Sequence, residues 1–283
     1  MRISHLLSAH RLAPLFGACF AAVSTAGIAQ PYDTEKGEET NTLQVETVIV
    51  TARRTDESGF DLATSWAVLD QTSIERVAAQ HSNQLFNRVS GAWVSRGNGQ
   101  ESLVSLRSPV LTGAGSCGAF MTAEDGISLR SPGFCNVNQL FDANLLQAGR
   151  VEVLKGPGTV VFGSNALHGI INVVTRSVDA TPNQIRVEAG SRDYYRVSAS
   201  GVVGSGIALS AQTSQYGGYQ DASGYDQQKA TLRIDQEWGG WQVDGALEGS
   251  QLDQETAGYI RGYEAYEDDQ ARKENPNPEA YRN

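Results

Sequence analysis

The sequence is poor in the residues that build metal sites and nucleophilic active sites. It has three cysteines and four histidines in 283 residues, too few to assemble a zinc or haem ligand set of recognised spacing. The G-x-S-x-G, P-loop and H-E-x-x-H patterns are also absent from the sequence. We therefore expect no catalytic activity, no metal site and no cofactor.

Basic residues are scarce as well. The chain has 22 Lys and Arg against 32 Asp and Glu, a net charge of −10. Proteins that bind nucleic acid need basic patches that neutralise phosphates. The acidic balance therefore argues against nucleic acid as a partner.

Long apolar runs are missing outside the N-terminus, so hydropathy predicts no transmembrane helix. The N-terminus itself has Arg2 and Arg11, an apolar stretch over residues 12–23, and small residues ending at Ala29. This order is typical of a secretory signal peptide, which we place at residues 1–29. An exported chain meets an oxidising compartment. There, a disulfide between Cys117 and Cys135 would close a loop of about 18 residues, and a pair of free buried thiols is the alternative.

The most informative stretch that is present runs from Gly149 to Arg176. Alternation over residues 150–155 predicts a half-buried strand with Val151 and Val153 on one face and the charges on the other. Gly156-Pro157-Gly158 predicts a turn. A second strand-like apolar piece, Val160 to Phe162, ends at Gly163, and a β-branched strand follows Gly169 over residues 170–175.

Taken together, this stretch resembles the last part of the plug domain of TonB-dependent outer-membrane receptors, whose pattern there is IEVxxGPxxxxYGxxAxGGxINxxT. Phe162 stands for the usual Tyr and His168 for the usual first Gly of the pair. The matching positions are Val151, Glu152, Val153, Gly156, Pro157, Phe162, Gly163, Ala166, Gly169, Ile171 and Asn172. The resemblance implies an α+β plug domain followed by the start of an antiparallel transmembrane β-barrel. Two arginines, Arg107 and Arg150, belong with Glu152, Gly156, Pro157, Gly163, Gly169 and Asn172 to the plug motif.

The segment ahead of the plug agrees with this resemblance. Residues 30–54 are expected to form a flexible periplasmic segment, since residues 30–43 are polar and acidic with little apolar surface to bury. A β-branched run then follows, made of Glu46, Thr47, Val48, Ile49, Val50, Thr51 and Ala52. A strand-forming run beside a disordered tail can add to the sheet of another protein. It resembles the TonB box, which pairs with the periplasmic protein TonB; the alternative is an ordinary first strand of the next domain.

The predicted plug covers residues 55–178. Asp70 or Thr72 can cap a helix in which apolar residues recur at helical spacing as far as Val89. Trp93 to Arg96 and Leu103 to Arg107 predict strands around Gly97-Asn98-Gly99. The segment from Phe120 predicts another strand, which ends at an Asp-Gly turn.

Beyond Arg176 the pattern changes. Apolar residues occur at every second position in segments of about ten residues between 185 and 247, separated by Gly-rich turns. This alternation is typical of antiparallel transmembrane strands, although soluble sandwiches share it. We predict about five strands, with residues 252–283 in a long loop. Residues 183–283 are thus expected to be the first strands of a truncated barrel, because a plug needs about 22 strands around it.

The resemblance implies uptake of a scarce small ligand across the outer membrane of a Gram-negative bacterium. A ferric siderophore is the first expectation, with cobalamin or haem as alternatives. TonB, with its inner-membrane energising complex, and the lipid of the outer membrane are the implied partners. Charges at Arg107, Arg150, Glu152 and Lys155 are expected to form polar contacts with the barrel. The rival hypotheses are a secreted or surface β-domain that binds without energy coupling and, last, an enzyme.

Overall fold

The computed structural model describes residues 49–50, 57–58, 64–97, 99–108, 120–129, 140, 142–163 and 166–282. The chain divides into two compact units, residues 1–45 and 46–283, and every described residue belongs to the second. The predicted signal peptide and most of the predicted flexible segment therefore lie outside the described residues.

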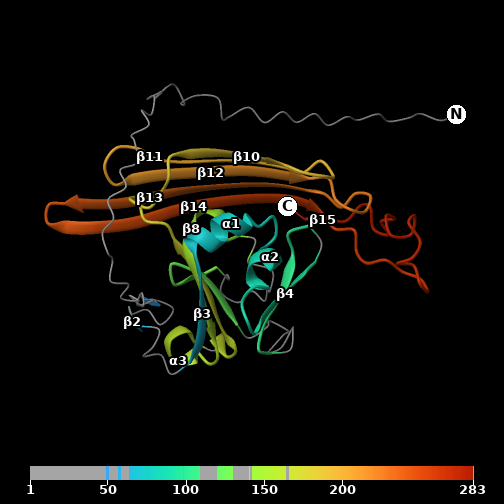
Figure 1. The fold of residues 1–283 in the computed structure, drawn as a ribbon, viewed down its shortest axis with the longest axis horizontal. Helices are drawn as coiled ribbons and strands as arrows, with labels where there is room; N and C mark the ends of the chain where they lie inside the picture. Colours follow the sequence, from blue (N-terminus) through green and yellow to red (C-terminus); the bar gives the residue numbers. More distant parts are fainter. Residues whose placement is uncertain are drawn as a thin grey trace, which may run out of the picture. The chain divides into compact units, whose positions relative to one another are not determined.

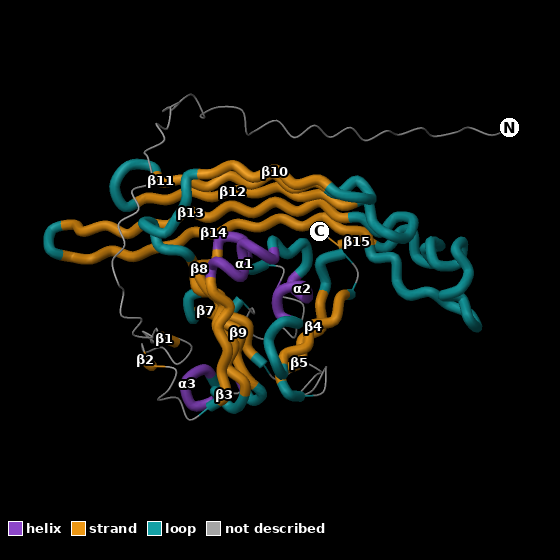
Figure 2. Tube along the Cα trace, in the orientation of Figure 1, coloured by secondary structure: helices purple, strands orange, loops and turns teal. Residues whose placement is uncertain are grey.

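The helices and strands follow one another as a mixed region and then a run of long strands (Figures 1 and 2). The first region contains β1 Ile49–Val50, β2 Glu57–Ser58, β3 Ser65–Asp70, α1 Gln71–Val77, α2 Ser82–Phe86, β4 Ala92–Arg96, β5 Ser102–Leu106, β6 Met121–Glu124, β7 Ile127–Ser128, the 3-10 helix η4 Leu145–Gln147, β8 Ala148–Lys155, α3 Thr159–Phe162 and β9 Gly169–Thr175. The second contains β10 Gln184–Ala189, β11 Tyr195–Val202, β12 Ile207–Tyr216, β13 Tyr225–Trp238, β14 Trp241–Glu255 and β15 Tyr281–Arg282.

A five-stranded sheet in the order β3-β8-β9-β6-β7 forms the centre of the first region. Neighbouring strands are antiparallel except β6 and β9, which run parallel. The half-buried character expected of β8 is wrong, because Val151 to Lys155 are all buried. Val151 and Val153 pack in one apolar cluster while Leu154 packs in a second, so both faces of the strand are covered.

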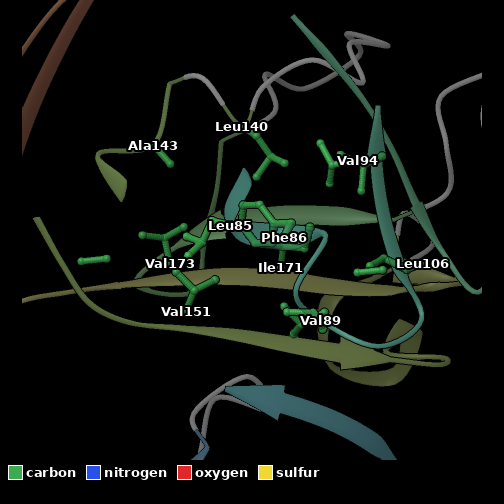
Figure 3. Close-up of a cluster of buried hydrophobic side chains, with 14 of the residues drawn as sticks. Leu85, Phe86, Val89, Val94, Leu106, Leu140, Ala143, Val151, Ile171 and Val173 are labelled. Carbon is green, nitrogen blue, oxygen red and sulfur yellow. The ribbon is translucent and has the colours of Figure 1, made fainter. Parts of the chain in front are cut away.

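The larger apolar cluster lies between this sheet, α2 and the β4–β5 hairpin (Figure 3). Leu85 and Phe86 of α2 meet Val94 of β4, Leu106 of β5 and Ile171 of β9 there. The hairpin itself has the predicted strands, paired from Ala92 with Leu106 to Arg96 with Ser102.

The single helix expected after Asp70 is wrong, because the structure has two short helices. Asp70 does cap the first, accepting a hydrogen bond of 2.7 Å from the backbone N–H of Ser73. The helix then ends at Ala78, which takes a left-handed φ of 46°. His81 caps the second helix: its Nδ1 accepts from the Asn83 N–H at 3.1 Å, and Gln84 Oε1 accepts from the His81 N–H at 3.3 Å. A break thus falls inside the apolar spacing that predicted one helix.

The piece from Val160 to Phe162 also departs from the prediction. It was expected to be extended, but it lies in the one-turn helix α3. The turn closes through the N–H groups of Val161 and Phe162, which donate to the carbonyl of Gly158 at 3.1 and 3.0 Å. A β-branched run this short does not decide between strand and helix when glycines flank it on both sides.

The long strands β10 to β14 pair in sequence order, each antiparallel to the next, and β15 pairs with β14. The five predicted strands are confirmed, although β14 runs on to Glu255, into the stretch expected to be loop, and β15 adds two residues within it. Residues 217–224 and 256–280 lie at one end of this sheet, which we call the loop end. The two-residue turn Gly239-Gly240 lies at the opposite, turn end (Figure 2).

The two faces of these strands differ as the alternation predicts. Arg196, Ser214, Tyr225 and Gln254 occupy paired positions on one face and are buried. Ile185, Val187, Val197, Leu209 and Leu247 occupy the other face and are exposed. Within the described part of the chain, no helix is long and apolar enough to cross a membrane.

Candidate functional site

The corner between β8 and β9 brings together the four glycine and proline residues of the plug motif. Lys155 at the end of β8 pairs with Gly169 at the start of β9. Between them, the Gly156 N–H donates to the His168 carbonyl at 3.0 Å, and the Gly158 N–H donates to the Ala166 carbonyl at 2.8 Å. Pro157 and Gly163 lie in this connection, before and after α3. The motif thus encodes a tight connection that places β9 antiparallel beside β8.

Asn172 fixes a second corner of the same sheet. Its Oδ1 accepts a hydrogen bond of 2.9 Å from the backbone N–H of Gly126. Gly126 follows Asp125 in the predicted Asp-Gly turn, where both residues have positive φ, 77° and 46°. The asparagine on β9 therefore holds the turn between β6 and β7.

The motif charges contact other parts of the plug. Arg150 Nε pairs with the buried Glu152 carboxylate at 2.7 Å. Lys155 Nζ donates to the Ser90 carbonyl at 2.9 Å, and Arg107 donates to Ser65 Oγ at 2.9 Å. Burial, with the Arg107 charge in second place, lowers the pKa of the Lys155 amine. The expectation that Glu152 and Lys155 lie on a surface facing the barrel is wrong, because both side chains are buried inside the plug.

Other residues carry the polar contacts between the plug and the long strands. Arg196 of β11 donates to the carbonyls of Ala78 and Ala79 at 2.8 and 2.7 Å. Further along the sheet, Thr231 accepts from Asn144 Nδ2 at 3.0 Å, and Gln254 Oε1 accepts from the Gln100 N–H at 2.9 Å. Lys229 donates to the Ala143 carbonyl. Near the turn end, Arg233 donates to Thr175 Oγ1 at 3.1 Å and lies 3.5 Å from the Asp125 carboxylate.

One buried carboxyl lies beside these contacts without a matching donor. Both carboxyl oxygens of Glu124 are buried, and they face the Glu248 carboxyl of β14, with which Glu124 forms a hydrogen bond only when one of the two is protonated. Burial, reinforced by the neighbouring Glu248 carboxylate, raises the pKa of Glu124 to about 9. Burial and the neighbouring charge therefore favour the protonated form of the Glu124 carboxyl.

At the loop end, two arginines and two tyrosines gather at the surface. Arg96 of the β4–β5 hairpin lies over the Tyr216 ring at 5.7 Å, and Arg192 lies over the Tyr219 ring at 4.9 Å. Arg192 also donates to the Tyr216 hydroxyl at 3.4 Å. We call Arg96, Arg192, Tyr216 and Tyr219 the loop-end cluster. It presents two cations and aromatic faces, which suit an anionic ligand that has planar groups.

The predicted TonB box is only partly described. Ile49–Val50 form β1, which pairs antiparallel with Glu57–Ser58 of β2 in a two-stranded sheet separate from the central one. The other box positions, Glu46, Thr47, Val48, Thr51 and Ala52, lie outside the described residues, as do Cys117 and Cys135. The coupling role of the box and the disulfide remain predictions. Among the described residues, no group of three or more His, Cys, Asp or Glu side chains could hold a metal ion.

The comparison with known families matches the plug region. Residues 58–170 fit the family model described as the TonB-dependent Receptor Plug Domain. Residues 58–170 therefore form a plug domain of the TonB-dependent receptor type. The match covers β2 to the start of β9 and includes the corner motif.

Individual relatives point the same way. The chain is 27% identical over 206 residues to the vitamin B12 transporter BtuB of Vibrio vulnificus, covering 72% of this chain and 32% of that protein. Among solved structures, the pyoverdine outer membrane receptor FpvA of Pseudomonas aeruginosa has a TM-score of 0.58 at 16% identity, over 72% of this chain and 30% of that one. The ferric yersiniabactin uptake receptor FyuA of Yersinia pestis has a TM-score of 0.52 at 22% identity, over 68% and 32%. The chain thus spans about a third of the length of these relatives, which are transporters and receptors by name.

Sequence reasoning missed the residues of the receptor strands that hold the plug. Arg196, Lys229 and Arg233 looked like ordinary solvent-facing positions of alternating strands. Arg196 and Lys229 fall on the polar side of the alternation and are nonetheless buried. Long cations on the lumen-facing register of the first barrel strands are the signal that could have identified them.

Proposed function

We propose that this chain forms the N-terminal part of an outer-membrane receptor of a Gram-negative bacterium, which imports a scarce small ligand with energy supplied through TonB. Residues 55–178 would be the plug and residues 183–283 the first barrel strands, with plug and box facing the periplasm. The observation that carries the proposal is the plug fold joined to long antiparallel strands that hold it through their polar face. Their apolar face is left for lipid.

The strands also indicate which way the receptor faces. Barrels of the outer membrane have short periplasmic turns and longer outer loops. The two-residue turn Gly239-Gly240 would therefore lie in the periplasm, and the loop of residues 256–280 would lie outside the cell. In this orientation, the loop-end cluster faces the outside, where a ligand arrives.

For the ligand we propose a ferric siderophore. The support is chemical: Arg96 and Arg192 supply two cations beside the rings of Tyr216 and Tyr219, a combination that favours an anionic chelate with planar groups. Cobalamin is the second candidate, favoured by the sequence relatives, which are named as vitamin B12 transporters.

Energy coupling would run through the box. Ligand on the outer side of the plug would release Glu46–Ala52 into the periplasm, and TonB would add its own strand to this segment. Such pairing uses backbone N–H and C=O groups. A pull by TonB would then displace part of the plug.

The test is a proline at Val48 in the full-length receptor. Val48→Pro removes one donor and fixes φ, so it should abolish uptake while leaving surface binding of the ligand intact. The matched control, Val48→Thr, keeps the strand preference and should transport nearly as well as the parent receptor. If Val48→Pro takes up ligand as well as the parent, the segment is not the coupling element. That result would favour the rival hypothesis, in which the domain binds ligand without energy coupling.

A second experiment identifies the ligand. Cells with the full-length receptor are offered a panel of 55Fe-loaded siderophores and labelled cobalamin. The double variant Arg96→Gln, Arg192→Gln should lose at least tenfold in affinity for the siderophore that is taken up. Arg261→Gln, which removes an exposed arginine lying 5.9 Å from the Tyr259 ring, is the control. Uptake of cobalamin alone would reject the siderophore proposal.

A further inference from the structure

Arg196 joins the long strands to the plug through two short hydrogen bonds from one buried guanidinium. Its guanidinium is buried and donates to both Ala78 and Ala79 carbonyls at 2.8 and 2.7 Å. The same group contacts both oxygens of Glu188, at 2.8 and 2.6 Å. Glu188 lies directly across from it on β10, so the carboxylate holds the arginine while the arginine holds the plug.

The contact falls at the C-terminal end of α1. Ala78 is the C-cap of this helix, and its left-handed φ of 46° turns the chain away from the helical path. Free carbonyls at a helix C-terminus carry partial negative charge, which a cation stabilises. Arg196 therefore supplies partners that the helix cannot supply itself.

The chain ahead of this contact is much less firmly held. Within the described part of the chain, β3 is an edge strand that pairs only with β8, and its side chains pack against the apolar clusters while staying half-buried or exposed. α1 buries a single residue, Ile74. One side-chain ion pair also ties α1 to the end of β9, Glu75 with Arg176 at 3.1 Å, but the Glu75 carboxylate is one-third exposed, so water weakens it.

Beyond the contact, the plug is anchored again. His81 Nε2 donates to the Glu101 carbonyl at 3.0 Å, and Leu85 and Phe86 fill the centre of the larger apolar cluster. The next hydrogen bond to the long strands along the chain is made by Gln100, with Gln254. Arg196 thus stands at the boundary between a lightly attached N-terminal segment and the packed body of the plug.

We propose that Arg196 and Glu188 form a mechanical stop in the plug. A pull from the N-terminal side frees β3 and α1 and is arrested at Ala78 and Ala79, so the plug opens by a defined length and keeps its core. The inference rests on the proposed function, in which force enters the plug from its N-terminal side. The inference adds the position at which unfolding of the plug stops and the two strand residues that bear the load there.

The test is a pulling experiment on the full-length receptor in a lipid bilayer, with a handle attached ahead of Ile49. In the parent receptor, the first release should free the chain from there to Ala78, about 30 residues or roughly 100 Å when extended. Arg196→Met keeps an apolar stem of similar size and removes every donor. Its first release should continue at least to Gln100, about 50 residues or roughly 170 Å.

Two further variants complete the design. Arg186→Met removes an arginine from β10 for which no hydrogen bond to the plug exists among the described residues, and it should release the same length as the parent. Glu188→Gln leaves Arg196 its carbonyl partners without the opposing charge, so it should release at the parent position at a lower force. Protection of the α2 amides from hydrogen exchange before pulling shows that each variant is folded. If Arg196→Met does not fold, the comparison of Glu188→Gln with the parent is the test.

The outcomes separate this inference from the proposed function. Equal first-release lengths in the parent and Arg196→Met would overturn the stop, as would a parent release that runs past Ala79. If Arg196→Met is unfolded, an unchanged arrest force in Glu188→Gln would overturn it. Because the handle applies the force directly, a failure of TonB to bind the box would leave these measurements valid.

Discussion

Replacing Gly169 by alanine should disrupt the corner on which the plug motif depends. Gly169 begins β9 with φ of +149°, a region that residues with a side chain rarely adopt. A Cβ at this position would overlap the carbonyl oxygen of Leu154 on the paired strand and lie 3.0 Å from Leu106 Cδ1. The obstacle is backbone in the middle of a sheet, so no rotation of a side chain relieves it.

The magnitude follows from these two effects. An alanine held in a sparsely populated backbone region costs about 1–3 kcal/mol, and an overpacked site costs about another 1–3 kcal/mol. Their sum is roughly 2–6 kcal/mol, centred near 4 kcal/mol, which is a large part of the total stability of about 5–15 kcal/mol that a domain has.

Gly163→Ala is the matched control. Gly163 lies in the same corner motif with φ of +82°, but a Cβ there would have no neighbour within 4 Å among the described residues. Only the conformational cost of about 1–2 kcal/mol should therefore apply. The difference between the two variants isolates the close approach of the β8 backbone.

The assay is hydrogen exchange of the β8 and β9 amides in the full-length receptor. Gly169→Ala should lower protection by at least a hundredfold, since each 1.4 kcal/mol is a factor of ten. Gly163→Ala should lower it by about tenfold. Equal losses in the two variants would show that the backbone overlap does not control the stability of this corner.

Three further predictions address single side chains. Mass spectrometry of the mature chain without reductant should find Cys117 and Cys135 linked, and two thiols free to alkylate would contradict this. Glu124→Gln should raise the unfolding temperature at pH 8. The pKa of Glu124 is raised in the folded state from 4.5 to about 9, so the parent protein becomes less stable as the pH rises from 4.5 toward 9. The difference in unfolding temperature between the variant and the parent should shrink as the pH falls toward 4.5. A difference that does not change with pH would contradict the prediction. His81→Asn keeps a capping acceptor and should remove a loss of stability below about pH 6.5, because burial lowers the pKa of His81 from its ordinary value of 6.5; an unchanged pH profile would refute this.

The strands and corners of the plug could be predicted because their signals are local. The Asp70 cap, the Asp125-Gly126 turn and the alternation of the long strands each depend on a few neighbouring residues. The break at Ala78 has no such signal, since alanine is a strong helix former and nothing beside it is Gly or Pro. Its left-handed conformation coincides with the Arg196 contact from a strand more than a hundred residues later.

The charged motif residues show the opposite limit. Glu152 alternates with valines and is therefore expected on the hydrated side of the strand. It is buried because a second apolar cluster, which includes Leu154 and Ile170, covers that face of the sheet. Lys155 lies on the valine face and is buried where its amine reaches the Ser90 carbonyl. Periodicity along one strand cannot reveal what a distant segment places over it.

The distribution of contacts bears on how a plug can be held and still move. Both apolar clusters are built from residues between Trp66 and Val173, so neither includes a residue of the long strands. The recorded contacts between plug and strands are hydrogen bonds and ion pairs of Arg196, Lys229, Arg233 and their neighbours. A hydrogen bond to a charged group adds about 1.5–3 kcal/mol net, because water can replace either partner. Apolar burial, at about 25 cal/mol per Å², has no such substitute. A pulled plug can therefore exchange its contacts with the barrel for water one at a time, while its apolar core keeps the remaining body folded.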